Sequence, residues 1–313
     1  MENRYFVYSD YLKKKYKEKV YKLPVNLPLT CPNRLDKKSG CAFCADVGTG
    51  FEAHDCSVSV KKQLEKTKIH IEEKYHAHKF IAYFQNYTNT FLPYDQFCSY
   101  ILDAATFPDI VEIAISTRPD CIREEYLAFL DSIRKQHNIQ ITIELGLQTA
   151  NYHTLQKINR GHGLAEFIDA VLKIKQYAFD ICTHVILNLP YDNENDCIET
   201  ARIISALQIP IVKIHSLYIA KNSVLCELYE NGTISICSKE EYLHRLMIFI
   251  ENLSPQIAIE RLFSRIPASD SVFCNWNTSW WKLKNEFEKL LNDNDSYQGK
   301  QYHYLNGAAL DLL

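Results

Sequence analysis

The sequence predicts an α/β protein whose parallel sheet curves into a partial or full barrel. From residue 79 onward, short runs rich in β-branched and aromatic residues alternate with stretches in which apolar residues recur every three or four positions. Strands that alternate with helices in this way pair in parallel, because each helix returns the chain to the same end of the sheet. No repeat of about 20 to 50 residues is present, which disfavours a solenoid.

Six strands are expected, each short and dense in residues that favour a buried strand. The first is LPVNLPL at 23–29, and the second is KFIAYFQ at 79–85. The remaining four are expected at 110–116, 139–147, 181–190 and 211–219. Helical periodicity is clearest at 123–137, 164–178 and 194–208. Periodicity alone leaves open whether the sheet closes.

The composition changes only after about residue 225. The segment 226–313 holds all three tryptophans and helical patterns such as KEEYLHRLMIFIENL. We therefore expect a core barrel with a basic N-terminal arm over 1–225 and a C-terminal helical extension, packed on the barrel, over 226–313. No glycine-serine linker separates the two.

Composition and charge exclude several classes of protein. Hydrophobic residues make up 47% of the 313 positions and charged residues 23%, and no apolar run approaches the roughly 20 residues that cross a bilayer, so no membrane is expected. The N-terminal residues carry lysines where a secretory signal needs an apolar segment, which predicts a cytoplasmic, reducing compartment. Eleven cysteines in that compartment indicate metal or redox chemistry where they cluster, rather than disulfides.

The net charge of −3 lacks the strong basic footprint of an autonomous nucleic-acid-binding protein. One local run is nevertheless basic, and three tyrosines are interleaved with it. Its lysines are Lys13, Lys14, Lys15, Lys17, Lys19 and Lys22. Such a run is either a solvated helix face or flexible arm, or a segment that contacts RNA phosphates.

Three cysteines, Cys31, Cys41 and Cys44, follow the first expected strand, with nine residues between the first two and two between the second pair. In a (β/α) barrel, the loops after the strands carry the chemistry. A structural zinc site needs four ligands, so His54 or Cys56 would have to complete one here. An iron–sulfur cluster also normally takes four thiolates. With three, one iron stays open to a substrate or cofactor.

Further blocks follow the cysteine loop in order along the chain. After CPNR at 31–34 come QNYTNTF at 85–91, ISTRPDCI at 115–122, ELGLQT at 144–149, LQKINRGH at 155–162 and VKIHSLYIAKNSVL at 212–225. Together they resemble the radical S-adenosylmethionine (SAM) superfamily, and within it the bacterial YhcC/YtqA-like group related to the elongator catalytic subunit. The resemblance covers residues 1–265, and the nine-and-two cysteine spacing is a minority pattern in that superfamily.

This resemblance implies a partial (β/α)6 barrel of the TIM type that carries a [4Fe-4S] cluster ligated by Cys31, Cys41 and Cys44. In the superfamily, the unligated iron chelates SAM. Reductive cleavage of SAM then gives a 5′-deoxyadenosyl radical, which abstracts hydrogen from the substrate. This chemistry belongs to the cofactor, and the protein positions SAM, shields the radical and selects the substrate.

The resemblance also implies a set of SAM-binding residues. Phe43 is expected near the adenine, and Arg160 is expected to pair with the SAM carboxylate, for which a guanidinium is suited. Glu144 is a buried charge at a strand end, so it is expected to face a ligand or an arginine. The remaining candidates are Gln85, Thr88, Asn89, Ser116, Arg118 and Gln148, which fall at or just after expected strands.

The catalytic residues stay open, with Glu144, His184 and His215 as candidates. A histidine on an apolar strand is often only a core residue, so the two histidines carry that alternative. The chain also departs from its relatives after the fifth strand, where NLPYDNE places Asn188 and Tyr191 at positions that are usually glycine. This departure puts in doubt any transfer of the substrate from relatives.

The expected function is therefore that of a radical SAM enzyme, served by an electron donor such as flavodoxin or ferredoxin. A transfer-RNA (tRNA) wobble uridine is the expected substrate, because elongator-type relatives modify that nucleoside and the lysine-tyrosine run suits RNA. One alternative is a small-molecule or porphyrin-type substrate, since ELGLQT and INRGH also resemble the oxygen-independent coproporphyrinogen oxidase group. A rival of another class is a zinc-binding RNA adaptor without catalysis.

Overall fold

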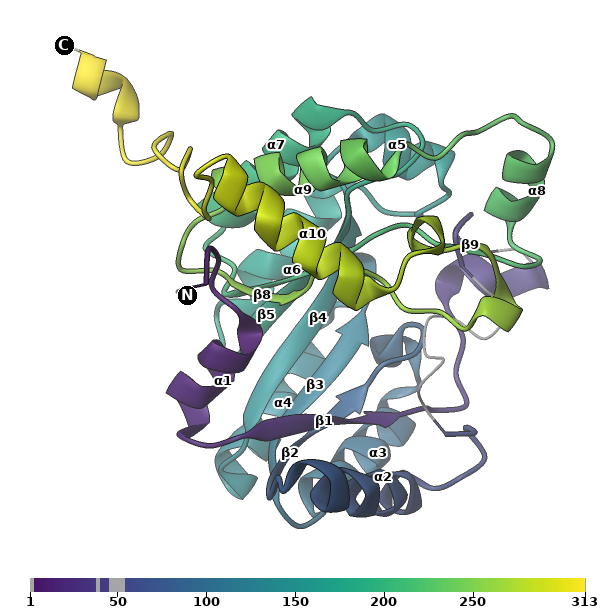
Figure 1. Ribbon diagram of the computed structural model, residues 1–313. Helices are drawn as coiled ribbons and strands as arrows, with labels where there is room; N and C mark the ends of the chain where they lie inside the picture. The colour runs from purple at the N-terminus through teal and green to yellow at the C-terminus, as the bar shows by residue number, and fades with distance from the viewer. Residues whose placement is uncertain (1–2, 38–39, 45–53, 313) are drawn as a thin grey trace.

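Seven strands form one parallel sheet in a computed structural model of the chain, which describes residues 3–37, 40–44 and 54–312. The strand order is β1-β2-β3-β4-β5-β6-β8. The strands are β1 (Val20–Val25), β2 (Lys79–Phe84), β3 (Ile110–Thr117), β4 (Gln140–Gln148), β5 (Asp180–Ile186), β6 (Ile211–His215) and β8 (Ala258–Arg261). Strands β1 and β8 form the two edges, so the sheet is a curled half-barrel (Figure 1). The prediction of an α/β partial barrel is confirmed.

Helices cover the outer face of the sheet because each returns the chain between parallel strands. They are α2 (Val60–Tyr75), α3 (Tyr94–Ala105), α4 (Glu124–His137), α5 (Tyr152–Lys157), α6 (Leu164–Ile174) and α7 (Glu194–Ala206). The apolar faces of the longer helices pack on outward-facing strand residues such as Phe80, Phe84 and Ile143, all fully buried. This is the main hydrophobic core.

The C-terminal segment adds helices α8 (Val224–Glu230), α9 (Lys239–Asn252) and α10 (Trp280–Asp293). Helix α9 packs on α7, and α10 packs on α9 across the front of the molecule in Figure 1. The helical C-terminal region expected from the sequence is confirmed. However, β8 also lies in this segment and joins the main sheet, and β9 (Ser271–Phe273) pairs with β7 (Ile219–Ala220). Sequence periodicity missed β8 because only four residues form the strand.

Helix α1 (Tyr8–Tyr16) lies against the inner face of the half-barrel, at the ends where the strands begin. Leu12 packs against Val20, Ile81 and Ala114, and the residue before the helix, Val7, bridges to Ile259 in β8. Lys15, in the last turn of α1, pairs with Glu112 at 2.9 Å and with Asp180 at 2.6 Å. The N-terminal segment is thus a helix that closes the amino-terminal end of the half-barrel rather than an arm.

The first strand is earlier than predicted, and this changes the interpretation of the lysine run. Strand β1 begins at Val20, so Lys22 lies inside it and points into the half-barrel, where Glu144 and Glu260 neutralise its charge. The ammonium group of Lys15 likewise forms ion pairs with two carboxylates. Neither alternative for the lysine run, a solvated face or arm or a segment that contacts phosphates, therefore fits these two lysines. The four exposed lysines are Lys13, Lys14, Lys17 and Lys19.

Candidate active site

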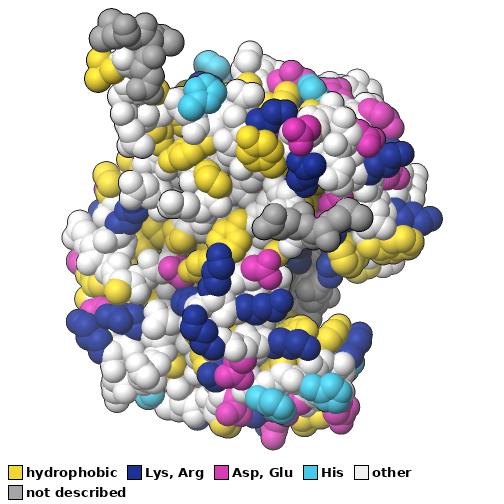
Figure 2. Space-filling view, turned by 60° about the vertical axis from the view of Figure 1, so that its left-hand side comes forward, with side chains coloured by type: hydrophobic (Ala, Val, Ile, Leu, Met, Phe, Trp, Pro, Cys, Tyr) yellow, Lys and Arg dark blue, Asp and Glu magenta, His cyan; other side chains and the backbone are white. Residues whose placement is uncertain are grey.

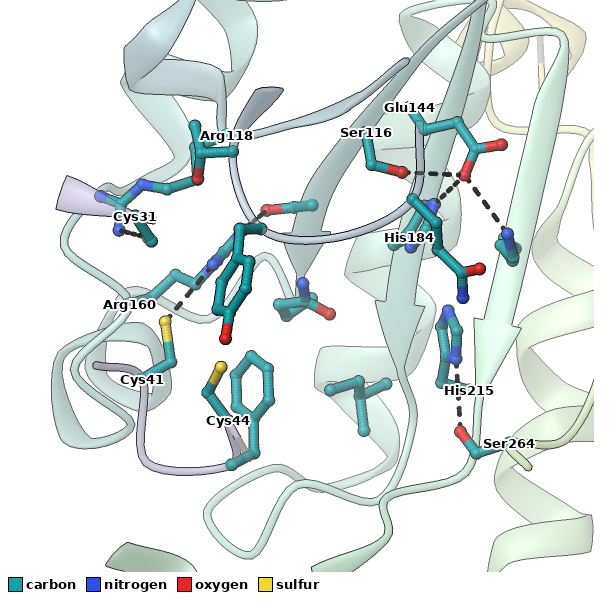
Figure 3. Close-up of a pocket in the computed structure, with 18 of the residues that line it drawn as sticks. Cys31, Cys41, Cys44, Ser116, Arg118, Glu144, Arg160, His184, His215 and Ser264 are labelled. Atoms are coloured by element: carbon teal, nitrogen blue, oxygen red, sulfur yellow. Dashed lines mark hydrogen bonds and ion pairs between the residues drawn. The ribbon is translucent and has the colours of Figure 1, made fainter. Parts of the chain in front are cut away.

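One cavity opens at the carboxyl ends of the strands, and nearly every residue expected at the site lines it. Figure 3 shows the three cysteines on one side and Glu144, His184 and His215 on the other. The expected residues that line the cavity are Cys31, Cys41, Phe43, Cys44, Gln85, Thr88, Ser116, Arg118, Glu144, Gln148, Arg160, His184 and His215. The β/α fold brings together residues that are far apart along the chain.

Asn89 is the one expected cofactor-binding residue outside this lining. It is buried in a short 3-10 turn after β2, and its amide nitrogen donates to the carbonyl oxygens of Phe84 at 3.0 Å, Asn86 at 3.2 Å and Ser116 at 2.8 Å. These bonds fasten the loop after β2 to the end of β3. Asn89 therefore holds the loop that presents Gln85 and Thr88, because its amide nitrogen is fully used by backbone.

Two arginines reach the cysteine sulfurs. Arg118 Nη1 lies 3.6 Å from Cys31 Sγ, and Arg160 Nη1 lies 3.4 Å from Cys41 Sγ. A cation that donates a hydrogen bond to sulfur favours the thiolate, which is the form that ligates metal. Burial raises the pKa of the Cys44 thiol, and the nearby Arg34 opposes that rise. Guanidinium groups therefore lie beside the sulfurs at this end of the cavity.

Arg160 is positioned by a glycine in β4. Its Nη2 donates to the Gly146 carbonyl at 2.8 Å, and a Cβ at Gly146 would lie only 2.4 Å from Nη2. Any side chain at 146 would therefore displace the guanidinium. The Nε of Arg160 is buried with no hydrogen-bond partner among the described residues. Such an unsatisfied donor in a cavity is expected where a polar ligand binds.

Strand β4 ends in a bulge that turns Gln148 toward the cavity. The register against β5 shifts between Gly146 and Gln148, and Gln148 has a φ of 77°, in the left-handed region that non-glycine residues rarely adopt. Bulges beside sites redirect side chains in this way. The strain falls on a residue that lines the cavity, as is common at functional sites.

Opposite the cysteines, the wall of the cavity holds a buried network of charges. Glu144 accepts from Lys22 at 2.6 Å and from Lys213 at 3.3 Å, and Glu260 pairs with the same lysines at 2.7 and 3.0 Å. Burial disfavours ionised Glu144, but Lys213 and Lys22 outweigh it and hold the pKa of this carboxyl well below its ordinary value. Glu144 thus faces lysines and His184, not an arginine.

Two histidines continue this network toward the cavity. His184 Nε2 lies 2.7 Å from Glu144 Oε2, and its ring centroid lies 5.2 Å from that of His215. Burial lowers the pKa of His184, and burial together with His184 and Arg261 lowers that of His215 well below its usual value. Both rings are therefore neutral near pH 7. His215 Nδ1 bonds Ser264 Oγ at 3.3 Å, and its Nε2 has no partner among the described residues.

The alternative fourth ligands for zinc lie outside the cavity. His54 Nε2 pairs with Thr67 on α2 at 3.2 Å, and neither His54 nor Cys56 contributes to the lining. Among the described residues, one group of three metal-type ligands gathers within 4.8 Å, and it is Glu144, Cys182 and His184. Two lysines already neutralise that carboxylate, which disfavours a cation there. Neither of the two alternative fourth ligands therefore lies in the cavity that the three cysteines line.

Sequence reasoning missed several residues of the cavity or its buried network. They are Tyr83, Glu260, Arg261, Ser264 and Arg265, together with Lys22, which the sequence pattern places in the arm. Tyr83 faces inward from β2, and its hydroxyl accepts from Lys213 at 3.0 Å. Glu260, Arg261, Ser264 and Arg265 belong to β8 or follow it, and β8 is too short to show a strand pattern in the sequence. Because side chains alternate between the two faces of a strand, the strand predicted at 79–85 places Tyr83 on the same face as Ile81.

The loop after β5 contains the departure from the pattern of relatives. Asn188 is buried, and its Oδ1 accepts from the Leu217 backbone nitrogen at 2.6 Å, which ties this loop to the one after β6. The ammonium of Lys157 lies 4.5 Å from the centroid of the Tyr191 ring. Neither Asn188 nor Tyr191 has a positive φ, so the backbone here does not require glycine.

Comparison with known proteins identifies the family of this chain. Residues 25–204 match the Radical SAM superfamily model, and residues 209–293 match the Radical_SAM C-terminal domain. An uncharacterised protein of Methanocaldococcus jannaschii is 32% identical over 94% of this chain and 91% of its own length. YtqA of Bacillus subtilis is 29% identical over 97% of this chain and 94% of its own.

Solved structures share the fold. The Methanocaldococcus infernus Elp3 lacking residues 1–46 superposes with a TM-score of 0.66 at 16% identity, covering 89% of this chain and 64% of that chain. Methylornithine synthase (PylB) gives a TM-score of 0.52 at 10% identity, covering 94% of this chain and 85% of that one. This protein spans less than two thirds of the Elp3 chain.

The fold and the matches define an enzyme class: a half-barrel enzyme of the kind that uses an iron–sulfur cluster and SAM. The chain belongs to the radical SAM superfamily, and its cofactors are a [4Fe-4S] cluster and SAM. The resemblance found in the sequence is thus confirmed. In the described part of the chain, no helix is long and apolar enough to span a membrane.

Proposed function

We propose that this radical SAM enzyme holds its cluster through Cys31, Cys41 and Cys44 and modifies a nucleoside of tRNA. The support for the ligand assignment is that all three cysteines line the same end of the cavity, with guanidinium groups at two of the sulfurs. When bound, the cluster and SAM supply a 5′-deoxyadenosyl radical. A small electron carrier such as flavodoxin or ferredoxin supplies the electron.

The chain's own residues divide the work of binding. Arg160 offers its unsatisfied Nε and its positive charge to the SAM carboxylate, and Phe43 offers an apolar face beside Cys44 for the adenine. Gln85, Thr88 and Gln148 supply hydrogen-bonding groups along the lining. The buried ion pairs around Glu144 keep the wall opposite the cysteines rigid, because each charge in these pairs already has a partner.

Two exposed tryptophans and an arginine beside the cavity support RNA as the substrate. Arg265 lines the cavity, and its guanidinium lies 4.0 Å from the centroid of the Trp280 ring. Trp280 is 39% exposed and the adjacent Trp281 is 50% exposed. Exposed indole rings next to arginine are suited to stacking unpaired bases, which RNA-modifying proteins must hold out of the helix.

The exposed lysines add a surface for phosphates. Lys13, Lys14, Lys17 and Lys19 lie on α1 or in the turn to β1, and Figure 2 shows lysine and arginine side chains gathered on one face of the molecule. Such charges attract the RNA backbone without reading its sequence. They match the wobble-uridine substrate expected from elongator-type relatives.

Nucleoside mass spectrometry of tRNA from a deletion strain tests this function. We expect one modified uridine to disappear and its precursor to accumulate, with recovery when the wild-type gene returns but not when the Cys41→Ala variant does. An unaltered nucleoside profile would reject the tRNA substrate and favour the small-molecule or porphyrin-type alternative.

A charge-reversal variant tests the lysine surface separately. With Lys13, Lys14 and Lys17 changed to glutamate, we expect weaker tRNA binding and a flatter salt dependence, with the slope smaller by about one unit for each phosphate that the variant no longer neutralises. Lys135→Glu with Lys173→Glu, on the helices of the outer face, is the matched control. SAM cleavage without substrate should stay near wild type in both. Equal tRNA binding by both variants would remove α1 from the interface.

A further inference from the structure

Four of the cations that line the cavity fall into two groups with different partners. At the cysteine end, Arg118 and Arg160 contact sulfurs, but Arg118 also pairs with Asp120 at 2.6 Å, so Arg160 is the cation left to match the cluster and the SAM carboxylate. The opposite wall, built from β6 and β8, carries Lys213 and Arg261. No anionic cofactor group is assigned to that wall, so any charge that balances these two cations must come from the protein or from the substrate.

The charge on Lys213 is already balanced. Lys22 and Lys213 face Glu144 and Glu260, so two positive and two negative charges cancel within one buried network. Arg261 is different, because its side chain makes no hydrogen bond or ion pair with another residue in the described part of the chain, although its backbone pairs with Lys213 in the sheet. It is half-buried and lines the cavity. Its charge is therefore uncompensated beside a site where substrate must enter.

A bulge in β8 is the reason that Arg261 reaches the cavity. Val212 pairs with Ile259, but the next residue of β6, Lys213, pairs with Arg261, so Glu260 is the extra residue. In a regular strand, neighbouring side chains point to opposite faces. Because of the bulge, two neighbouring residues both reach the inside of the half-barrel: Glu260 pairs with Lys213, and Arg261 lines the cavity. An arrangement that exposes an unpaired guanidinium to a cavity is suited to a ligand.

His215 supplies a second unsatisfied group on the same wall. Its Nε2 is buried without a partner among the described residues, while Nδ1 bonds Ser264 Oγ. In the tautomer in which Nδ1 accepts from the serine hydroxyl, Nε2 carries a proton that it can donate into the cavity. A neutral histidine donor and an arginine are a combination that binds the oxygens of a carboxylate or a phosphate.

We propose that Arg261, with Nε2 of His215, binds an anionic oxygen group of the substrate, either a carboxylate or a phosphate, at the wall opposite the cysteines. The inference rests on the proposed function in one respect, since it takes this cavity as the place where the substrate reacts. It does not depend on the substrate being RNA. It assigns to Arg261 a role in selecting the substrate.

Calorimetric titration of the reconstituted holoenzyme with SAM bound tests the site, with inorganic phosphate and glutarate as probes in buffer of low chloride. We expect wild type to bind at least one probe and Arg261→Gln to bind it at least about tenfold more weakly, because a charged hydrogen bond is removed. A preference for phosphate points to a nucleotide phosphate, and a preference for glutarate points to a substrate acid. The affinity of Arg261→Lys for the probe should lie between those of wild type and Arg261→Gln.

Arg123→Gln is the matched control, because Arg123 is exposed, pairs with Glu125 and does not line the cavity. It should bind the probe like wild type, and iron content confirms that each variant is folded. Binding of neither probe by wild type, or equal binding by wild type and Arg261→Gln, would overturn the proposal. An unaltered tRNA profile in the deletion strain would reject the tRNA substrate alone and leave the titration result intact.

Discussion

The two ends of the half-barrel both bury charged groups, but they differ in how completely those groups are paired. At the amino-terminal end, Lys15 pairs with Glu112 and Asp180, and the hydroxyls of Tyr11 and Tyr16 donate to the same two carboxylates. The hydroxyl of Thr142 also donates a hydrogen bond of 2.8 Å to Glu112. The described residues thus satisfy this network, which fixes α1 under the sheet.

At the other end of the half-barrel, where the strands have their carboxyl ends, some buried polar groups lack partners. Arg160 Nε and His215 Nε2 have no hydrogen-bond partner among the described residues, and Arg261 has no ion pair there. Buried polar groups are nearly always bonded, so unmet ones in a cavity indicate where ligands bind. The comparison teaches that charge burial alone does not locate the site. Unmet groups that also line the cavity do.

The largest effect is expected at the cysteine end. Alanine at Cys31, Cys41 or Cys44 should each abolish the cluster, because a three-cysteine site has no ligand to spare. Iron and sulfide analysis after anaerobic reconstitution should give about four of each per wild-type chain and none in these variants. Cys56→Ala and His54→Ala are the controls and should keep the cluster. Equal loss in either control would show a fourth protein ligand.

The amino-terminal end should respond in stability rather than in ligand binding. Lys15→Ala leaves Glu112 buried without its cation and should lower the free energy of unfolding by about 3 kcal/mol, measured by urea denaturation. The exposed Lys13→Ala should change it by less than about 0.5 kcal/mol. SAM binding should be unchanged in both. A loss of SAM affinity in folded Lys15→Ala would remove the functional distinction between the two ends.

Arg160 tests whether the unmet Nε marks the SAM carboxylate. Arg160→Ala should weaken SAM binding by about tenfold or more, because a charge-assisted hydrogen bond is removed, while iron content is kept. Arg160→Lys should restore part of the affinity but not the forked geometry. Equilibrium dialysis with labelled SAM measures both. An unchanged dissociation constant in the alanine variant would exclude Arg160 from SAM binding.

A pH-dependent effect on stability is expected from Asp192, in the loop that departs from the pattern of relatives. Burial raises its pKa to about 6 from 3.8, so the folded state binds the proton more tightly than the unfolded state. Stability should therefore fall as the pH rises from about 4 to about 6. Asp192→Asn should remove this dependence and stabilise the protein above pH 7 by up to about 3 kcal/mol.

Urea denaturation at several pH values measures this contribution of Asp192. Asp293→Asn, at an exposed position at the end of α10, is the control and should leave the pH profile unchanged. A wild-type profile that is flat between pH 4 and 7, with Asp192→Asn no more stable at pH 8, would show that hydrogen bonds to the carboxylate offset its burial.

The cysteine end was largely predictable from the sequence, and the opposite wall was not. Cys41, Arg118 and Arg160 lie in or beside contiguous blocks at strand ends, where residue type and position both indicate a site. Arg261 reaches the cavity only because of a bulge in β8, and register depends on a strand partner remote in sequence. Lys22 resembles one more surface lysine in the sequence, because hydropathy cannot reveal a carboxylate that neutralises it inside the sheet.

Electron paramagnetic resonance of the reduced, reconstituted protein tests most directly whether the carboxyl-terminal end is the SAM site. The account predicts that adding SAM changes the spectrum of the reduced cluster, because SAM binds the iron that the three cysteines leave open. Lys15→Ala should show the same change, since it alters only the amino-terminal end. A spectrum that is identical with and without SAM, in wild-type protein that holds a full complement of iron, would contradict the account.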